Sequence, residues 1–142
     1  MYNLFNVDVP CDNGSNIEDY REYLTKLIDL LELNPLSFIF GDFNANTLSS
    51  THRFGRELLH ICNLENVTVS DLVYCNEDSF TFLSEAHGAV AWLDHLLSTH
   101  TMHALIERIW VDYGFISSDH LPIKVELNIA SANTPPQKQE GS

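Results

Sequence analysis

The first 42 residues are patterned as a strand, a helix and a second strand, and this order constrains the fold more than any other feature of the chain. Residues 2–9 have the pattern of a strand. A helix is expected to follow, from a capping box at Ser15–Glu18 to about Leu33, because apolar residues recur there at helical spacing. Residues 36–40 form a nearly continuous apolar run, which suits a strand buried on both faces.

The rest of the chain predicts one further helix and then mainly strands. The helix is expected over about residues 51–62, and residues 67–73 fit either a strand or a loop. Further strands are expected at residues 79–83, 89–98, 106–111 and 121–129. This order indicates a layered α/β fold. We expect one domain over residues 1–130 and a disordered tail over residues 131–142, which are polar and contain Pro135–Pro136.

The chain is strongly acidic, with 7 Lys and Arg residues against 20 Asp and Glu residues and a net charge of -13. This balance argues against a protein that is held on nucleic acid mainly by its charge. It does not exclude a nuclease, because carboxylates that hold a divalent cation make a site acidic before the metal binds. No apolar run approaches the ~18 residues that a membrane span needs, so we expect no membrane partner.

The cysteines indicate a compartment. Cys11, Cys62 and Cys75 are too few and too scattered for a disulfide framework, and no CxxC motif occurs. The segment Met1–Phe5 has no basic leader followed by a long apolar core, so no signal peptide is expected. We therefore expect reduced thiols in a reducing, intracellular compartment.

The first candidate for chemistry is Gly41-Asp42-Phe43-Asn44, at the end of the predicted buried strand. In extended geometry, positions two apart share a face, so the side chains of Asp42 and Asn44 would point the same way. A carboxylate can orient or deprotonate a water, and a neutral amide can bind a phosphate oxygen without repelling it. The alternative is a polar turn that only ends the strand.

The second candidate is the segment Ser117–Ile123, just before the last predicted strand. Asp119 could bind a hard cation. His120 could act as an acid or base, or stabilise a phosphate as an imidazolium. The alternative is a turn rich in Ser and Asp that carries a solvated histidine.

The third candidate is Asp94, which lies in the otherwise apolar segment Ala91–Leu97. A carboxylate there needs a partner, because an unpaired buried charge is costly. A histidine is the natural partner, since a carboxylate on one ring nitrogen fixes the tautomer and raises the basicity of the ring. His120 or His95 could fill this role, whereas a place on a solvent-facing edge would remove the need for a partner.

Taken together, three motifs resemble those of the endonuclease/exonuclease/phosphatase superfamily: Phe38–Ala45, Trp92–Leu97 and Ser118–Ile123. They are most similar to the apurinic-like endonuclease domains of non-LTR (LINE-type) retrotransposons. Phe5–Cys11 and Ser79–Phe82 are similar to two further strands of that family. The resemblance covers nearly the whole chain. It implies part of a two-sheet, DNase I-like α/β sandwich, mostly its C-terminal half.

The resemblance also implies a role for each matching residue. Asp42 would orient the attacking water, and Asn44 would support both Asp42 and the phosphate. Asp94 would pair with His120, His120 would polarise the scissile phosphate, and Asp119 would bind the metal. The implied reaction is hydrolysis of a phosphodiester, dependent on Mg²⁺ (or Mn²⁺), with DNA as the substrate. A nuclear location would suit such an enzyme of retroelement origin.

The chain departs from the family pattern in two ways. The early strands that bring an Asn and the metal-binding Glu have no counterpart here, since Glu18, Glu22 and Glu32 lie on a predicted helix. Asp8 stands where the family has a Tyr, and an ionised Asp cannot donate a hydrogen bond to a phosphate. Two alternatives therefore stay open, namely a catalytically inactive, truncated remnant and a small-molecule phosphoesterase of the same superfamily.

Two further hypotheses follow. If half of the sandwich is absent, a sheet face is left uncovered, and the chain is expected to be unstable alone or to self-associate through that face. His95, His100 and His103 suggest a zinc site, but no cysteine lies near them, which makes zinc the weaker interpretation.

Overall fold

The computed structural model of the protein describes residues 2–115 and 118–128. Its centre is a four-stranded sheet in the order β1-β2-β6-β3. These strands are β1 (Asn3–Asp8), β2 (Ser37–Asp42), β6 (Asp94–Ser98) and β3 (Thr68–Val69). The expected disordered tail, residues 131–142, lies outside the described residues.

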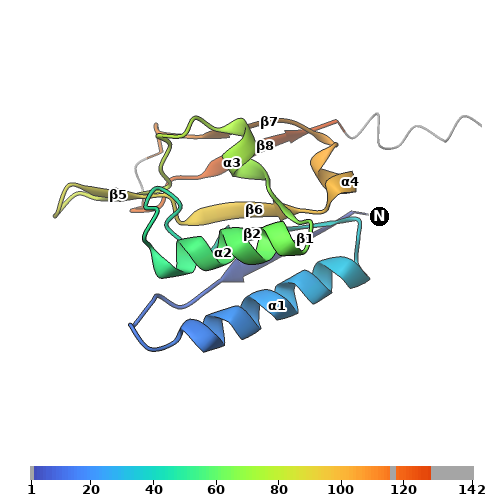
Figure 1. Ribbon diagram of the computed structural model, residues 1–142. Helices are drawn as coiled ribbons and strands as arrows, with labels where there is room; N and C mark the ends of the chain where they lie inside the picture. The colour runs from blue at the N-terminus through green and yellow to red at the C-terminus, as the bar shows by residue number, and fades with distance from the viewer. Residues whose placement is uncertain (1, 116–117, 129–142) are drawn as a thin grey trace, which may run out of the picture.

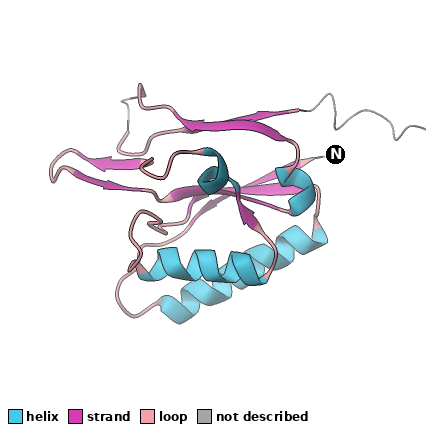
Figure 2. Ribbon diagram, turned by 45° about the horizontal axis from the view of Figure 1, so that its top comes forward, coloured by secondary structure: helices cyan, strands magenta, loops and turns pink. Residues whose placement is uncertain are grey.

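Two layers cover the central sheet (Figure 1 and Figure 2). One face carries the helices α1 (Ile17–Leu33) and α2 (Arg53–Leu64). Over the other face lies the antiparallel pair β7 (Ile106–Val111) and β8 (Ile123–Leu127). The short helices α3 (Ser70–Tyr74) and α4 (His100–His103) lie between this pair and the sheet. The hairpin of β4 (Phe82–Ser84) and β5 (Ala89–Ala91) projects from one end.

Strand β2 is buried between these layers, as its apolar run predicts. Phe38 and Ile39 have 5% and 0% of their surface exposed. Ile39 belongs to the core beneath α1 and α2, where the Tyr20 ring stacks on Phe54 with 3.7 Å between centroids. Phe38 belongs to a second core beneath β7 and β8. The mixed α/β architecture of several sheets confirms the predicted fold class.

The pairing register places three carboxylates in one row. Strand β1 runs parallel to β2 with Asp8 opposite Asp42, and β6 runs antiparallel to β2 with Asp94 opposite Asp42. Helix α1 makes the crossover that a parallel β1–β2 pair requires. Asp8 and Asp42 end β1 and β2, whereas Asp94 begins the antiparallel strand β6, so the three residues share one edge of the sheet.

An open apolar groove of about 370 Å³ lies between the central sheet and β8. Its lining includes Leu4 of β1, Phe40 of β2, and Val125 and Leu127 of β8. Leu4 remains 64% exposed, so the apolar surface continues from the groove to the edge strand β1. Among the described residues, no helix is both long enough and apolar enough to cross a bilayer.

Helix α1 does not use the predicted capping box. It begins at Ile17, with Asn16 as the residue before it and no side-chain cap bond. The Asn16 side chain is instead bound within the preceding turn, where it donates to the Cys11 carbonyl and accepts from the Asn13 N–H. Local turn hydrogen bonds have therefore replaced the cap.

Three strand predictions need correction. Residues 67–73 form neither a simple strand nor a loop, because β3 passes directly into helix α3. The predicted strand 89–98 is divided into β5 and β6 at Trp92 and Leu93, whose N–H groups bind the side chains of Asn46 and Thr81 instead of a neighbouring strand. The strand expected at 79–83 is formed only from Phe82 onward.

Substitution of Gly41 tests the close approach of β1 and β2. Gly41 has φ +151°, and a Cβ atom built there would lie 2.0 Å from the Val7 carbonyl oxygen. Gly41→Ala is expected to lower the free energy of unfolding by about 2–4 kcal/mol, because the backbone of β1 must move. Gly114→Ala is the control and should change it by less than about 0.5 kcal/mol. Urea unfolding measures both, and equal losses would contradict the close contact.

Candidate active site

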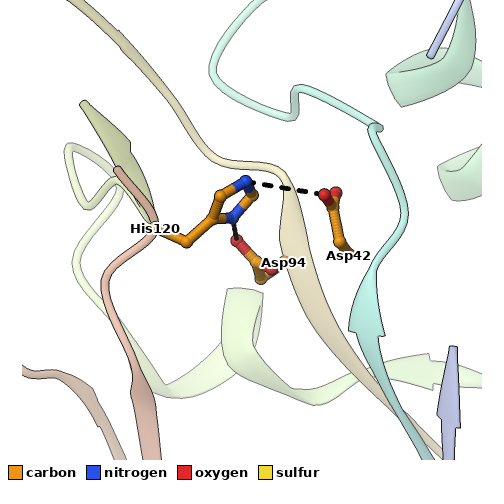
Figure 3. A group of neighbouring side chains, drawn as sticks. All are labelled: Asp42, Asp94 and His120. Atoms are coloured by element: carbon orange, nitrogen blue, oxygen red, sulfur yellow. Dashed lines mark hydrogen bonds and ion pairs between the residues drawn. The ribbon is translucent and has the colours of Figure 1, made fainter. Parts of the chain in front are cut away.

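Three side chains from distant parts of the sequence meet at the edge of the central sheet (Figure 3). His120 donates from Nδ1 to Asp94 Oδ2 at 2.9 Å. Its Nε2 lies 3.5 Å from Asp42 Oδ2. The three residues line an open hollow of about 580 Å³ together with Asp8. The structure therefore brings Asp42, Asp94 and His120 together, and it selects His120 rather than His95 as the partner of Asp94.

The backbone on either side of His120 is bound to the segment that leads into β4. The Leu83 N–H donates to the Asp119 carbonyl at 3.0 Å, and the Leu121 N–H donates to the Thr81 carbonyl at 2.7 Å. The Phe82 ring meets the His120 ring edge-on, with 5.3 Å between centroids. These contacts fix the position of the imidazole.

Thr81 also orients the start of β6. Its side-chain oxygen, completely buried, accepts from the N–H groups of Leu93 at 2.9 Å and of Asp94 at 3.1 Å. Thr81 therefore holds the backbone of Asp94 through its side chain and the backbone beside His120 through its own carbonyl group. This explains structurally why the Ser79–Phe82 motif accompanies the other three motifs.

The electrostatics of the cluster favour a charged histidine beside two carboxylates. Burial by itself lowers the pKa of His120, but the hydrogen bond and charge of Asp94, together with the charges of Asp42 and Asp119, outweigh it and raise that pKa. Burial raises the pKa of Asp42, although the Asn44 N–H opposes this effect. An imidazolium can bind a phosphate oxygen, and a carboxylate with a raised pKa is a better proton acceptor.

Asn44 supports Asp42, but not through the expected strand geometry. Asn44 has φ +48°, so the chain is no longer extended there, and the prediction of two side chains on one strand face is wrong. Instead, the Asn44 backbone N–H donates to Asp42 Oδ1 at 2.9 Å, and its side-chain amide donates to the Val9 carbonyl. Asn44 thus links the Asp42 carboxylate to the end of β1.

Asp119 lies outside this cluster. It is exposed and lines a separate hollow with Phe80 and Tyr113. Among the described residues, the group whose ligand atoms lie within 4.8 Å of one another consists of Asp42, Asp94 and His120. Its two carboxylates are the hard oxygen donors that a divalent cation prefers, and a cation would also relieve their mutual repulsion. The donor set therefore fits a divalent metal, of which the identity is open.

The sequence did not reveal a second, buried pair next to this cluster. His95 donates from Nδ1 to Asp71 Oδ2 at 2.7 Å, and both side chains have no exposed surface. His103 instead contacts the Ser70 hydroxyl, so His95 and His103, two of the three histidines considered for zinc, bind different partners. The only signal for this pair was Asp71 itself, a carboxylate within the mostly apolar segment Val67–Val73.

The fold and the arrangement of the cluster are those of the endonuclease/exonuclease/phosphatase superfamily. The family described as endonuclease-reverse transcriptase matches residues 2–124, and the chain therefore belongs to that family. This confirms the resemblance on which the roles of the site residues were predicted.

Solved structures share the fold. The 3'-5' exonuclease NExo of Neisseria meningitidis is 18% identical, with a TM-score of 0.64 over 88% of this chain and 60% of its own. The endonuclease domain of TRAS1, a telomere-specific non-LTR retrotransposon, is 20% identical, with a TM-score of 0.64 over 87% of this chain and 56% of its own. A mannosyl-6-phosphatase of Bacteroides thetaiotaomicron is 20% identical, with a TM-score of 0.56 over 87% of this chain and 50% of its own. The chain thus spans between half and three-fifths of the length of these proteins.

Removal of the Asp94 charge tests the electrostatics of the cluster. Asp94→Asn is expected to lower the pKa of His120, because its first hydrogen-bond partner then carries no charge. The ring protons of His120 report this in an NMR titration with a chelator present. Glu126→Gln is the control, since Glu126 pairs with Arg108 and not with His120.

The same pair should make stability depend on pH. The pKa of His120 in the folded chain lies above its ordinary value of 6.5. The contribution of the Asp94–His120 pair to the free energy of unfolding is therefore complete below about pH 6.5, and it is lost as the pH rises through the folded pKa. Asp94→Asn should flatten this dependence. An unchanged His120 pKa in Asp94→Asn would contradict the assignment of the pair.

Proposed function

We propose that the chain hydrolyses phosphodiester bonds in DNA as an endonuclease of retroelement origin. The observation that carries this proposal is the hydrogen bond from His120 to Asp94 directly beside the Asp42 carboxylate. Membership of the endonuclease-reverse transcriptase family supports it, as does the fold shared with TRAS1, whose described function is that of an endonuclease domain.

The geometry suggests a division of labour. Asp42 orients the attacking water and accepts its proton, while the Asn44 N–H holds the carboxylate in place. His120, kept charged by Asp94, binds a non-bridging oxygen of the scissile phosphate and stabilises the charge that develops there. Asp94 keeps the imidazole in one orientation.

We propose Mg²⁺ or Mn²⁺ as the cofactor. Bound Mg²⁺ or Mn²⁺ would supply Lewis-acid stabilisation of the phosphate. Asp119 remains our proposed metal ligand, and Asp42 and Asp94 are alternative donors within the cluster. Mg²⁺ is usually held by one or two carboxylates plus substrate phosphates, so DNA itself would complete such a site.

Asp8 modifies the site. It lies opposite Asp42 in the row of three carboxylates and lines the same hollow, so it adds negative charge where a phosphate would bind. This charge weakens binding of an anionic substrate, which favours the alternative of an inactive remnant. A phosphate monoester is the substrate class of one structural neighbour, the mannosyl-6-phosphatase. An inactive remnant would keep the fold without the reaction.

We propose that the apolar groove between the sheet and β8 supports self-association. The lining residues Leu4, Phe40, Val125 and Leu127 are apolar and offer a surface against which a second copy of the chain could pack. We also propose a reducing compartment such as the nucleus, in keeping with three free cysteines. DNA as the substrate is in keeping with the same location.

Plasmid nicking tests the catalytic proposal. With Mg²⁺ or Mn²⁺, supercoiled plasmid should be converted to relaxed circles, and a chelator should stop the reaction. Asp42→Asn and His120→Gln should each reduce the rate by about 10²–10⁴-fold, because each removes a group that acts in proton transfer or charge stabilisation.

Asp29→Asn is the charge-matched control, since Asp29 lies exposed on helix α1. Hydrolysis of a sugar phosphate without plasmid nicking would favour the phosphatase alternative. Turnover of neither substrate would favour the inactive remnant and reject the nuclease for this chain.

Sedimentation tests the self-association. We expect dimers or larger species at micromolar concentrations, and Leu4→Lys should shift them toward monomer by placing a charge at the groove. Leu33→Lys is the control, because Leu33 is 80% exposed on α1, away from the groove. A stable, compact monomer of the unaltered chain would contradict this proposal.

A further inference from the structure

A buried network surrounds Asp71 of α3 and includes His95, the residue that follows Asp94 in β6. The Asp71 side chain has no exposed surface. Its Oδ2 accepts from Trp92 Nε1 at 2.9 Å and from His95 Nδ1 at 2.7 Å, and its Oδ1 accepts from the Leu96 N–H at 2.8 Å. These donors compensate a charge that would otherwise be too costly to bury.

His95 uses both of its ring nitrogens. Its Nε2 lies 2.9 Å from the Ala45 carbonyl oxygen, which can only accept, so Nε2 carries a hydrogen. Both Asp71 oxygens already accept from N–H groups, so Nδ1 carries a hydrogen as well. This hydrogen-bond pattern fits an imidazolium. Burial alone lowers its pKa, but the charge and hydrogen bond of Asp71 outweigh burial and raise it.

The network joins three elements that are far apart in the sequence. Asp71 belongs to α3, His95 follows Asp94 in β6, and Ala45 follows Asn44 in the loop after β2. The Asn44 N–H in turn binds Asp42 Oδ1. A continuous chain of contacts therefore runs from Asp71 through His95 to the loop that follows Asp42.

This loop needs such support. Asn44 has a positive φ of 48°, a left-handed conformation that is uncommon for residues other than glycine, although Asn adopts it more often than most. Conformations of this kind persist where the surrounding structure determines them. The fixed Ala45 carbonyl is the anchor that follows Asn44, while the Phe43 N–H binds the Leu93 carbonyl at 2.9 Å before it.

We propose that Asp71 and His95 are positioning residues that hold the loop of residues 42–46 against β6, so that Asp42 lies beside the Asp94–His120 pair. This inference rests on the proposed hydrolytic function. A pair that only stabilised the fold would have no specific effect on turnover. A displacement of about 1 Å at a catalytic group can cost about 10²-fold in rate, so a small movement of the loop would be measurable.

The kinetic test uses His95→Gln and Asp71→Asn in cleavage of a short DNA duplex. For the folded fraction of each variant we expect kcat to fall by about 10–100-fold with KM changed by less than about threefold. Leu31→Val is the control, because Leu31 is completely buried in the last turn of α1 and belongs to neither the loop nor the hydrogen-bonded network. An unchanged kcat in folded His95→Gln would overturn the proposal.

A second measurement does not depend on activity. In ¹⁵N NMR spectra, the backbone signals of Asn44 and Asn46 should move in His95→Gln and stay in place in Leu31→Val. Signals that stay in place in both would overturn the positioning role. If the unaltered chain cleaves no DNA, the proposed function fails, and this measurement still decides whether the pair positions the loop.

The unaltered chain provides a test even if neither variant folds. Two slowly exchanging ring N–H signals are expected for His95, one for each nitrogen, because both are bound and inaccessible to solvent. Detection of only one ring N–H would overturn the proposed contact with Ala45 or with Asp71.

Discussion

Backbone hydrogen bonds that pair β2 with β1 and with β6 place Asp8, Asp42 and Asp94 side by side at one edge of the sheet. Gly41 permits this pairing, because any side chain there would meet the Val7 carbonyl. Three carboxylates in a row repel one another, and the row is tolerable only where positive groups and N–H donors face it. His120 and the Asn44 N–H meet that requirement. The register of the sheet therefore determines the geometry of the site, and the site contacts in turn stabilise that register.

Two Asp–His pairs are built on successive residues of β6. Asp94 binds His120 at the half-exposed edge, while His95 binds Asp71 in the interior. Successive residues of a strand point to opposite faces, so one short strand serves both pairs. The same chemical pairing therefore forms part of the candidate site on one side and, in the role proposed above, supports the loop after Asp42 on the other.

Local sequence patterns identified the apolar β2 strand, helix α1 and the residues Asp42, Asp94 and His120, because each has a signal within a few neighbouring positions. Local patterns left both His95 and His120 as possible partners of Asp94, and only the family resemblance implied His120. In the structure the bridge between Phe82 and His120 places the imidazole beside Asp94. The left-handed backbone of Asn44 and the role of Asp71 depend on contacts with distant residues. The short helix α3 was missed for the same reason, because a five-residue helix has little periodicity to detect.

The fold is shared by nucleases and by a sugar phosphatase, so the fold does not select the substrate. The proposed hydrolysis depends instead on His120 and Asp94 acting as one unit. A double-mutant cycle tests this most directly. Turnover of a DNA duplex is measured for Asp94→Ala, His120→Ala and the double variant. We expect the double variant to be no slower than His120→Ala alone, because Asp94 acts through the histidine. Losses that multiply, or a full rate in either single variant, would contradict the account.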